Sequence, residues 1–260
     1  MLRAVLADLH LSSVAGDLDR FAATLSAVRH RGAEEVVFLG DLFRTLVGFP
    51  HFWDDETRRG LAELERLRSA GVRVILVEGN RDFFLDAAAM APFLDVAGEV
   101  HSFAAGTRRF LLEHGDLINH RDRSYRLWRA VSKSRTARRW ARLLPAGVAV
   151  RIVSNTEARL AQTNFSYRRT LPVDDLVAAA RRHFSAGVDV VMWGHFHRGW
   201  RFEEDGCAAM VLPSWAETGA VVWVDDLGSV RTEQVADSGY FVDSAAQSWY
   251  QEGESRVEVR

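Results

Sequence analysis

The sequence predicts an α/β protein built around a largely parallel sheet. Short apolar runs, rich in valine, isoleucine, leucine and phenylalanine, alternate along the 260-residue chain with longer segments of helical periodicity. Runs of this length and composition are typical of strands covered on both faces. Alternation of strand and helix favours parallel pairing through right-handed crossovers. A third observation is that a short polar block follows each of five such runs.

The expected elements follow one another in a regular order. Strands are predicted at residues 2–7, 35–39, 72–77, 110–112 and 188–193, and helices at residues 17–31, 54–70 and 173–186. Three later strand-like runs, at residues 208–212, 220–224 and 229–235, are expected to form a second sheet. The pattern predicts a core made of residues 1–118 and 171–236.

The alternation of predicted strands and helices stops at residues 119–170, which we interpret as an inserted helical cap. Between residues 121 and 151, nine arginines and Lys133, the only lysine of the chain, stand against the single acid Asp122. Charge of this kind is typical of contact with phosphate or an anionic surface. The segment also carries an approximate apolar stripe, formed by Leu127, Val131, Trp140 and Leu144. Residues 237–260 are expected to be a loosely held polar tail.

Composition places the chain among ordinary folded proteins. A net charge of −2, a hydrophobic share of 48% and a charged share of 26% are typical of a soluble domain. The first apolar run is short and interrupted by Asp8, so we expect no signal peptide, no membrane span and a cytoplasmic location. The single cysteine, Cys207, excludes an internal disulfide framework and a thiolate metal cluster. We expect it to be a small residue in or near the core.

The five polar blocks are rich in metal-binding side chains. They read DLH at residues 8–10, GD at 40–41, GNRD at 79–82, HGD at 114–116 and GHFH at 194–197. Histidine, aspartate and asparagine offer nitrogen and oxygen ligands to divalent ions such as manganese, magnesium, iron or zinc. The carboxyl ends of strands are where open α/β sheets bind ligands. The blocks therefore predict a metal site at one edge of the fold.

In order and kind, the blocks resemble those of the calcineurin-like metallophosphoesterases. The resemblance implies a four-layer αββα sandwich with an inserted helical cap, and a site for two divalent ions. It also implies that Asp41 bridges the two ions. One ion would be held by Asp8, His10, Asp41 and His197, and the other by Asp41, Asn80, His114 and His195.

The charges of this ligand set suit a phosphate substrate. Two divalent ions carry four positive charges, and the carboxylates of Asp8 and Asp41 contribute only two negative ones, which leaves an excess of two positive charges. Asn80 ligates through a neutral oxygen and leaves that excess in place. Two ions can activate a water and clamp the oxygens of an in-line displacement. Asp82 and Asp116 are expected to orient ligands or backbone, with a turn-capping role open for Asp116.

A closer resemblance, within that family, is to the UDP-2,3-diacylglucosamine diphosphatases of lipid A synthesis. It rests on the strings ADLHL, GDLF, GNRDFF and HGD, with Arg81 after Asn80. It implies Mn²⁺-dependent hydrolysis of UDP-2,3-diacylglucosamine, a nucleotide-sugar lipid, at the α phosphorus, which gives UMP and 2,3-diacylglucosamine 1-phosphate (lipid X). The implied catalytic residues are Asn80, Arg81 and His114. The implied substrate contacts are Asn80, Arg81, Asp122, Tyr125, Asn155, Thr156 and His195.

Several alternatives stay open at this point. Arg81 would either hold phosphate oxygens or form a surface ion pair with Asp82 or Asp86. The apolar side chains of the cap would line an acyl-chain chamber, contact the anionic surface of the inner membrane, or belong to a core or a solvated face. These side chains are Trp128, Trp140, Leu143 and Leu144.

Two other functions compete with the leading one. The first is a metallophosphoesterase that acts on another nucleotide diphosphate or phosphodiester. The second is a non-catalytic interaction module, although such a module would be expected to have lost ligands, and all seven are present here. Nucleic acid is not an expected partner, because the basic segment lacks interleaved aromatic residues. No obligate protein partner is inferred.

Overall fold

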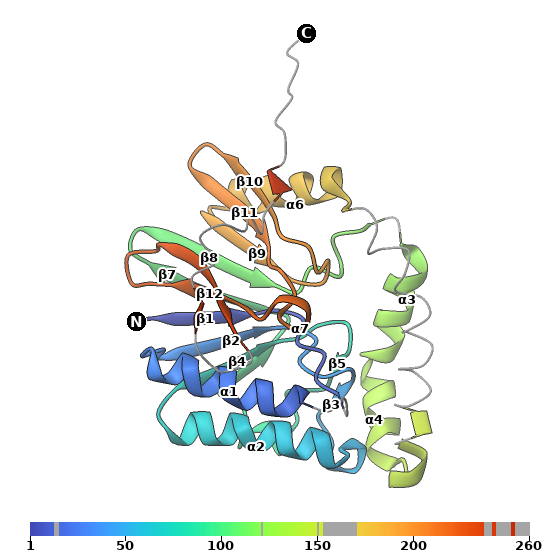
Figure 1. The fold of residues 1–260 in the computed structure, drawn as a ribbon. Coiled ribbons are helices and arrows are strands. Elements are labelled where there is room, and N and C mark those ends of the chain that lie inside the picture. The colour runs from blue at the N-terminus through green and yellow to red at the C-terminus, as the bar shows by residue number, and fades with distance from the viewer. Residues whose placement is uncertain are drawn as a thin grey trace.

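A computed structural model describes residues 1–12, 16–120, 122–149, 151–152, 171–236, 241–242 and 251–252. Two stacked sheets form its centre (Figure 1). The predicted Asn155 and Thr156 lie outside the described residues.

The first sheet has seven strands and contains the N-terminal part of the chain. Its four parallel strands are β1 (Arg3–Leu6), β2 (Glu35–Leu39), β4 (Arg73–Val77) and β6 (Val96–Gly98). Three further strands extend it on the other side of β1 with antiparallel pairing, namely β12 (Ala220–Val224), β13 (Val230–Val235) and β14 (Phe241–Val242). The predicted parallel order is thus confirmed for the first three strand predictions.

The second sheet has six strands, and its membership differs from the prediction. It runs in the order β15 (Gln251–Glu252), β10 (Trp200–Glu204), β11 (Cys207–Val211), β9 (Val190–Trp193), β8 (Arg108–Glu113) and β7 (Val100–Ala105). The runs at 220–224 and 229–235 were expected here but lie in the first sheet. Hydrophobic pattern reveals a strand and not its neighbours, which explains why that expectation was wrong.

Helices cover the outer face of each sheet and complete four layers. Helices α1 (Asp17–His30) and α2 (Asp55–Ser69) cover the first sheet, and α6 (Val173–Ser185) covers the second (Figure 1). Alternate residues of β1 explain the layering, because Ala4 and Leu6 pack in the cluster that contains Phe21 of α1, whereas Val5 packs between the sheets. The αββα sandwich implied by the resemblance is therefore confirmed.

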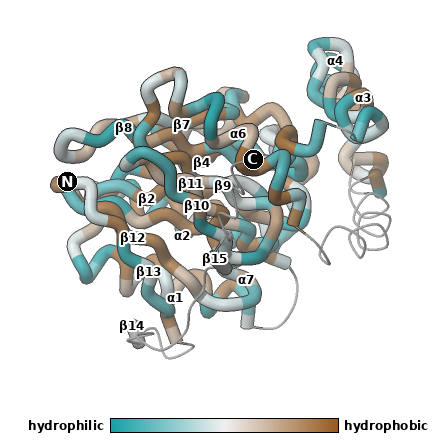
Figure 2. Tube along the Cα trace, turned by 90° about the horizontal axis from the view of Figure 1, so that it is seen from above, coloured by the Kyte–Doolittle hydropathy of each residue, from teal (hydrophilic) through white to brown (hydrophobic). Residues whose placement is uncertain are grey.

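The helices of the arginine-rich segment lie to one side of the sandwich. Figure 2 shows α3 (Arg123–Ser132) and α4 (Arg135–Leu143) standing apart from the sheets. One side of α4 packs through Ala137 and Ala141 on an apolar cluster that surrounds β3 (Leu46–Val47) and β5 (Asp82–Phe83), a pair of short parallel strands.

Most of the apolar stripe predicted for this segment is exposed. Leu127, Val131 and Trp140 expose 62–68% of their surface, while Leu144 is half-buried against the apolar cluster. Within the described residues, the stripe is therefore not a core. Across the same residues, every helix is too short or too polar to span a lipid bilayer.

Short elements complete the described chain. They are the 3₁₀ turns η1 (Pro50–Phe52) and η2 (Ala88–Met90) and the one-turn helix α7 (Trp215–Thr218). Two pieces of the predicted tail, β14 and β15, pair at the edges of the two sheets. Cys207 is half-buried at the start of β11, where a near-core residue was expected.

Candidate metal centre

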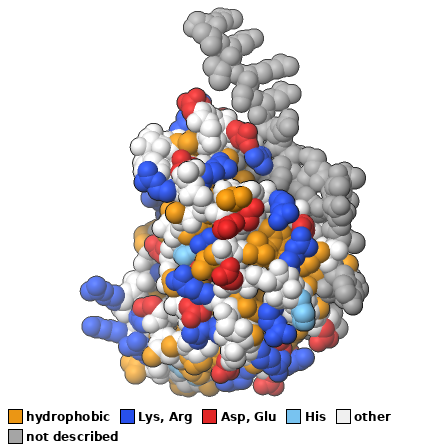
Figure 3. All heavy atoms as spheres, turned by 90° about the vertical axis from the view of Figure 1, so that its left-hand side faces the viewer, with side chains coloured by type: hydrophobic (Ala, Val, Ile, Leu, Met, Phe, Trp, Pro, Cys, Tyr) orange, Lys and Arg blue, Asp and Glu red, His pale blue; other side chains and the backbone are white. Residues whose placement is uncertain are grey.

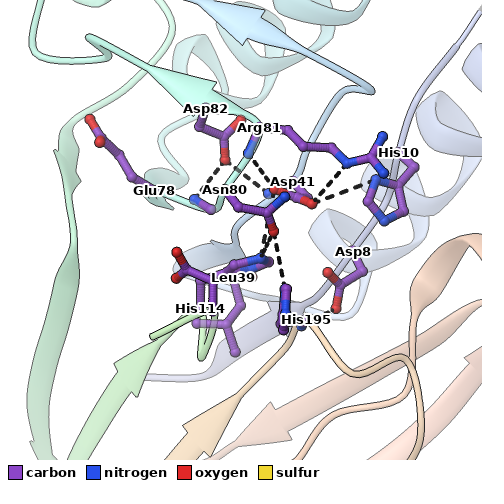
Figure 4. Close-up of polar contacts among 12 residues, drawn as sticks. Asp8, His10, Leu39, Asp41, Glu78, Asn80, Arg81, Asp82, His114 and His195 are labelled. Atoms are coloured by element: carbon purple, nitrogen blue, oxygen red, sulfur yellow. Dashed lines mark hydrogen bonds and ion pairs between the residues drawn. The ribbon is translucent and has the colours of Figure 1, made fainter. Parts of the chain in front are cut away.

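The five polar blocks meet in one place. They follow β1, β2 and β4 of the first sheet and β8 and β9 of the second, and the carboxyl ends of these strands point to the same side of the sandwich. Figure 4 shows the side chains of these loops pointing toward one another around Asp41. The seven predicted ligands are Asp8, His10, Asp41, Asn80, His114, His195 and His197, and the structure brings all of them into this cluster.

Asp8, His10 and His197 form one group of converging donors. The Nε2 atoms of His10 and His197 lie 3.1 Å apart, and Nε2 of His197 lies 3.8 Å from Oδ1 of Asp8. Ligands about 2.1 Å from one divalent ion lie roughly 3 Å from each other when they bind at right angles. The spacing of this group therefore fits a shared ion.

Asn80, His114 and His195 form a second group, which lies across Asp41 from the first. The Oδ1 atom of Asn80 lies 3.0 Å from Nε2 of His114 and 3.0 Å from Nδ1 of His195. Nδ1 of His114 lies 3.0 Å from the Leu39 carbonyl oxygen and donates to it, so in the neutral ring Nε2 carries a lone pair. Either a proton on Nε2 or a metal ion between Nε2 of His114 and Oδ1 of Asn80 satisfies the lone pairs of both atoms.

Asp41 lies between the two groups and faces both. Its Oδ1 is 3.7 Å from Nε2 of His114, and its Oδ2 is 3.9 Å from Nδ1 of His10 (Figure 4). The structure also groups Asp41 and His114 with Asp8. The carboxylate is thus placed so that each oxygen can serve a different ligand group.

The backbone at the candidate ligands is strained. Five of them have φ in the left-handed region, with values of 48° to 69°, namely Asp8, His10, Asp41, His195 and His197. This region is uncommon for residues other than glycine, and each occurrence costs about 1–3 kcal/mol. Such strain concentrates at functional sites, where the surrounding structure imposes the conformation.

Glycines allow the loops to approach one another closely. A Cβ atom at Gly40 would lie 2.2 Å from Nδ1 of His114, and one at Gly79 would lie 2.3 Å from Oδ1 of Asp41. At Gly194 it would lie 2.9 Å from Oδ2 of Asp8. The glycines of three polar blocks are therefore required sterically, because each leaves room for a candidate ligand from another loop.

Burial sets the charge state of the donors. It lowers the pKa of His10 to about 3 and that of His195 to about 4, so both rings are neutral at pH 7 and available as ligands. Burial also raises the pKa of Asp8. For His114, burial alone would lower the pKa, but the carboxylates of Asp41 and Asp8 outweigh it and raise the pKa. The site therefore attracts positive charge.

Among the candidate ligands, two buried side-chain atoms lack hydrogen-bond partners within the described part of the chain. They are Oδ1 of Asp8 and Nδ1 of His10. Leaving a buried polar atom unpaired costs about 1–3 kcal/mol, so each such atom requires an explanation. A divalent ion bound by the cluster explains Oδ1 of Asp8, which lies 3.8 Å from Nε2 of His197, and an oxygen donor suits such an ion.

Neighbouring groups orient the candidate ligands. Oδ2 of Asp82 accepts the backbone N–H groups of Asp41 and Gly79, each at 2.8 Å, in line with the orienting role predicted for Asp82. Nδ1 of His197 lies 3.0 Å from Oε1 of Glu217 on α7 and donates to it, which directs Nε2 toward Asp8 and His10. Sequence reasoning missed Glu217, because a half-exposed glutamate in a short helix belongs to no motif.

Arg81 is buried beside Asp41. Its Nε lies 3.4 Å from Oδ2 of Asp41, and its Nη1 donates to the carbonyl of Arg44 at 3.4 Å. The alternative of a surface ion pair with Asp82 or Asp86 is wrong, because Arg81 is buried and pairs with Asp41. The Asp41 carboxylate that pairs with Arg81 is a candidate metal ligand, so Arg81 belongs to the site.

The structure gives Asp122 and Tyr125 contacts of their own on α3. The Asp122 side chain accepts the backbone N–H of Tyr125 at 2.8 Å and caps the helix. The Tyr125 hydroxyl donates to Oδ2 of Asp116, which also lies 2.9 Å from Nε of Arg129. Asp116 thus joins the His114 loop to α3. The predicted substrate contacts of Asp122 and Tyr125 stay predictions.

Fold and site together define a class of protein. An αββα sandwich whose loops bring histidine, aspartate and asparagine donors together fits a metal-dependent hydrolase. A sequence model described as "Calcineurin-like phosphoesterase" matches residues 1–199 of the chain.

Curated relatives agree with this class. A UDP-2,3-diacylglucosamine hydrolase from Ralstonia nicotianae is 30% identical over 81% of this chain and 82% of its own. Proteins of the same name from Stenotrophomonas maltophilia and Pseudomonas putida are each 28% identical, over 85% and 86% of this chain and 93% and 95% of their own. This chain therefore belongs to the calcineurin-like phosphoesterase family and is a metal-dependent hydrolase.

Proposed function

We propose that the protein hydrolyses the diphosphate of UDP-2,3-diacylglucosamine with two metal ions. In this reaction a water oxygen forms a bond to the α phosphorus, and the bond from that phosphorus to the bridging oxygen breaks. The products are UMP and 2,3-diacylglucosamine 1-phosphate. The names of the curated relatives and the extent of the matches support this substrate.

The position of Asp41 carries the proposal of two metals. Its two oxygens face different histidines, His114 and His10, at 3.7 and 3.9 Å. Asp8, His10, Asp41 and His197 would hold one ion, and Asp41, Asn80, His114 and His195 the other. Bound divalent ions, proposed to be Mn²⁺, would supply Lewis-acid activation of water and neutralise charge on the phosphate.

Arg81 is proposed to bind the phosphate oxygens. Its guanidinium carries five N–H donors, and the contacts with Asp41 and Arg44 leave others available. A planar guanidinium holds phosphate oxygens in pairs, and buried donors of this kind stabilise charge that develops in the transition state. Asn80, His114 and His195 lie together near the other oxygen of Asp41 and are also proposed to contact the reacting diphosphate.

The arginine-rich segment is proposed to act as a cap that meets lipid. In this proposal residues 119–170 form the cap, residues 1–118 and 171–236 the core, and residues 237–260 the tail. Trp140 and Leu143 of α4 expose 67% and 76% of their surface, beside the exposed basic residues Arg135 and Arg139. Exposed aromatic and basic side chains on one helix suit an anionic membrane surface.

The face of the molecule away from α3 and α4 has a different character. Figure 3 shows acidic and basic side chains intermixed across it. A mixed surface of this kind gives little attraction to an anionic bilayer. The contrast supports α4 as the side that would approach the cytoplasmic face of the inner membrane.

The test is turnover of UDP-2,3-diacylglucosamine by the full chain with Mn²⁺, with UMP and lipid phosphate followed by mass spectrometry. Wild-type protein is expected to release both products, and Asp41→Ala is expected to lose turnover and bound metal. Asp19→Ala is the matched control, because Asp19 is an exposed aspartate on α1 that forms a weak surface ion pair with Arg59 at 4.0 Å.

The outcomes separate the parts of the proposal. Hydrolysis of bis(p-nitrophenyl) phosphate without UMP release would keep the metal chemistry and reject the lipid substrate, in favour of another phosphodiester or nucleotide diphosphate. Full activity of Asp41→Ala would reject the two-metal assignment. No hydrolysis of either compound by metal-loaded protein would reject both.

A further inference from the structure

One face of α3 is directed at the metal centre. Tyr125, Arg129 and Lys133 follow one another at intervals of four residues, which places them on the same side of a helix. Lys133 is the C-cap residue of α3, and its side chain is only 11% exposed although it is a lysine. The side chain of Arg129 is 13% exposed. Long charged side chains are buried to this degree mainly when they are paired.

The first two residues hold the loop that carries His114. The Tyr125 hydroxyl donates to Oδ2 of Asp116, two residues after His114, and Nε of Arg129 forms an ion pair with the same oxygen at 2.9 Å. Arg129 also reaches Oε1 of Glu99 through Nη2 at 2.9 Å. One carboxylate oxygen therefore contacts two side chains from consecutive turns of α3, one through a hydrogen bond and one through an ion pair, and the HGD loop is joined to that helix.

Lys133 holds the loop that carries Asn80. Its Nζ donates to the carbonyl of Gly79 at 2.9 Å and to Oε2 of Glu78 at 3.2 Å. The backbone N–H of the same glycine is bound by Asp82 at 2.8 Å. Gly79 is thus held through both of its polar backbone groups, and the next residue in the chain is Asn80.

These two loops supply ligands to the same side of the site. Oδ1 of Asn80 lies 3.0 Å from Nε2 of His114, and both residues belong to the group that includes His195. The contacts of Tyr125, Arg129 and Lys133 described above reach the loops of Asn80 and His114. They do not reach those that carry Asp8, His10 and His197. The three side chains therefore act on one half of the centre.

We propose that Tyr125, Arg129 and Lys133 are positioning residues for the metal position formed by Asn80, His114 and His195. The proposal rests on the two-metal function proposed above. It predicts that loosening this face of α3 weakens the binding of one metal ion and leaves the other nearly unchanged. Groups that orient metal ligands typically change affinity by about 10–100-fold when they are removed.

The experiment is a Mn²⁺ titration of the metal-free full chain, followed by electron paramagnetic resonance of free Mn²⁺. Wild-type protein is expected to bind two equivalents. Lys133→Met and Arg129→Met are expected to retain one equivalent at wild-type affinity and to bind the second at least about 10-fold more weakly. Lys133→Arg keeps a donor for Gly79 and a charge for Glu78, so it is expected to restore most of the second affinity.

Arg123→Met is the matched control, because Arg123 is exposed on the first turn of α3. It is expected to bind Mn²⁺ as the wild type does. Thermal unfolding of each metal-free variant detects general loosening of the fold. Equal weakening of both equivalents, or a Tm loss that Lys133→Arg does not reverse, would mean that α3 only stabilises the fold.

Failure of this inference is distinct from failure of the proposed function. Two equivalents with unchanged affinities in Lys133→Met and Arg129→Met would overturn the positioning role and leave the two-metal function intact. A single equivalent in the wild type would overturn the two-metal function and the positioning role with it.

Discussion

Nδ1 of His197 lies 3.0 Å from Oε1 of Glu217, and the histidine donates to the glutamate. This contact fixes the ring so that its other nitrogen faces Asp8 and His10. A carboxylate behind a ligating histidine also raises the basicity of the ring.

Removal of that carboxylate should weaken metal binding without unfolding the protein. Glu217→Ala is expected to lower Mn²⁺ affinity about 10–100-fold, because His197 loses its orienting partner. The side chain of Glu217 is half-exposed, so the free energy of unfolding of the metal-free protein should change little. Metal titration and thermal unfolding measure the two effects. Glu65→Ala, an exposed position on α2, is the control, and equal affinities in the two variants would contradict the prediction.

A methyl group at Gly79 should disrupt the centre by steric contact. In Gly79→Ala the new Cβ would lie 2.3 Å from Oδ1 and 2.6 Å from the backbone nitrogen of Asp41, so Asp41 must move. We expect loss of bound metal, measured by plasma emission, and loss of hydrolysis. At Gly147 a Cβ meets nothing within 4 Å, so Gly147→Ala should behave as the wild type. Normal metal content in Gly79→Ala would contradict this prediction and show that the loop can move enough to accommodate the methyl group.

Arg81 should affect turnover more than metal content. Arg81→Ala is expected to reduce kcat about 10²–10³-fold, the usual effect of removing one preorganised donor at a reacting centre. Both metal ions should stay bound, because the guanidinium is not a ligand. Arg81→Lys should recover only part of the rate, since an ammonium lacks the planar pair of parallel N–H donors that a guanidinium offers to two phosphate oxygens. Loss of metal from Arg81→Ala would instead assign the residue to support of Asp41.

The stability of the sandwich should depend on pH through Glu35. This buried carboxylate lies 3.1 Å from Nε of Arg3, 3.0 Å from Nη1 of Arg73 and 3.4 Å from Nε2 of His101. Burial alone would raise the pKa of Glu35, but the close contact with His101 and the charges of His101 and the two arginines outweigh it and lower the pKa. The ionised group therefore stabilises the fold above its ordinary pKa, and this contribution is lost as pH falls through the lowered value.

Glu35→Gln tests this pH dependence. At pH 7 the substitution should lower the free energy of unfolding by about 3 kcal/mol, because Arg3 is left buried without its carboxylate. The difference from the wild type should shrink below pH 4.5. Urea unfolding of the metal-free proteins at several pH values measures it, and a difference that is constant with pH would refute the charge argument.

Trp140 should contribute to membrane association if α4 meets lipid. Trp140→Glu removes an exposed apolar ring and adds a charge that an anionic surface repels, so sedimentation with anionic vesicles should decrease. Leu227→Glu is the control, because Leu227 is 76% exposed in the turn between β12 and β13. Equal sedimentation of the wild type and both variants would reject the membrane contact of α4.

Much of the site could be predicted because its signals are local. Each candidate ligand follows a buried apolar strand, and the strand and its polar block are adjacent in sequence, as for Leu39 and Asp41. The αββα arrangement came from a resemblance, since the apolar pattern alone assigned β12 and β13 to the wrong sheet. Pairing of strands depends on the path of the chain between them, which the residues of a single strand do not encode.

Two supports of the site, Glu217 and Lys133, could not be predicted for the same reason. Glu217 reaches His197 across 20 residues, and Lys133 reaches Gly79 across 54. Lys133 was conspicuous as the only lysine of the chain, yet nothing in the sequence connects it to the GNRD block. Such contacts join surfaces that become neighbours only after the fold has formed.

The pairing of β1 with β12 has a consequence for biosynthesis. Asp8 follows β1, and its backbone carbonyl accepts a hydrogen bond from the Ser214 hydroxyl at 2.9 Å, while β12 pairs along β1 itself. A nascent chain of about 200 residues already contains every candidate ligand, but it lacks the segment that fixes the first of them. Because distant contacts of this kind form late in folding, metal loading should follow completion of the C-terminal strands, and ribosome-bound intermediates should remain without bound metal.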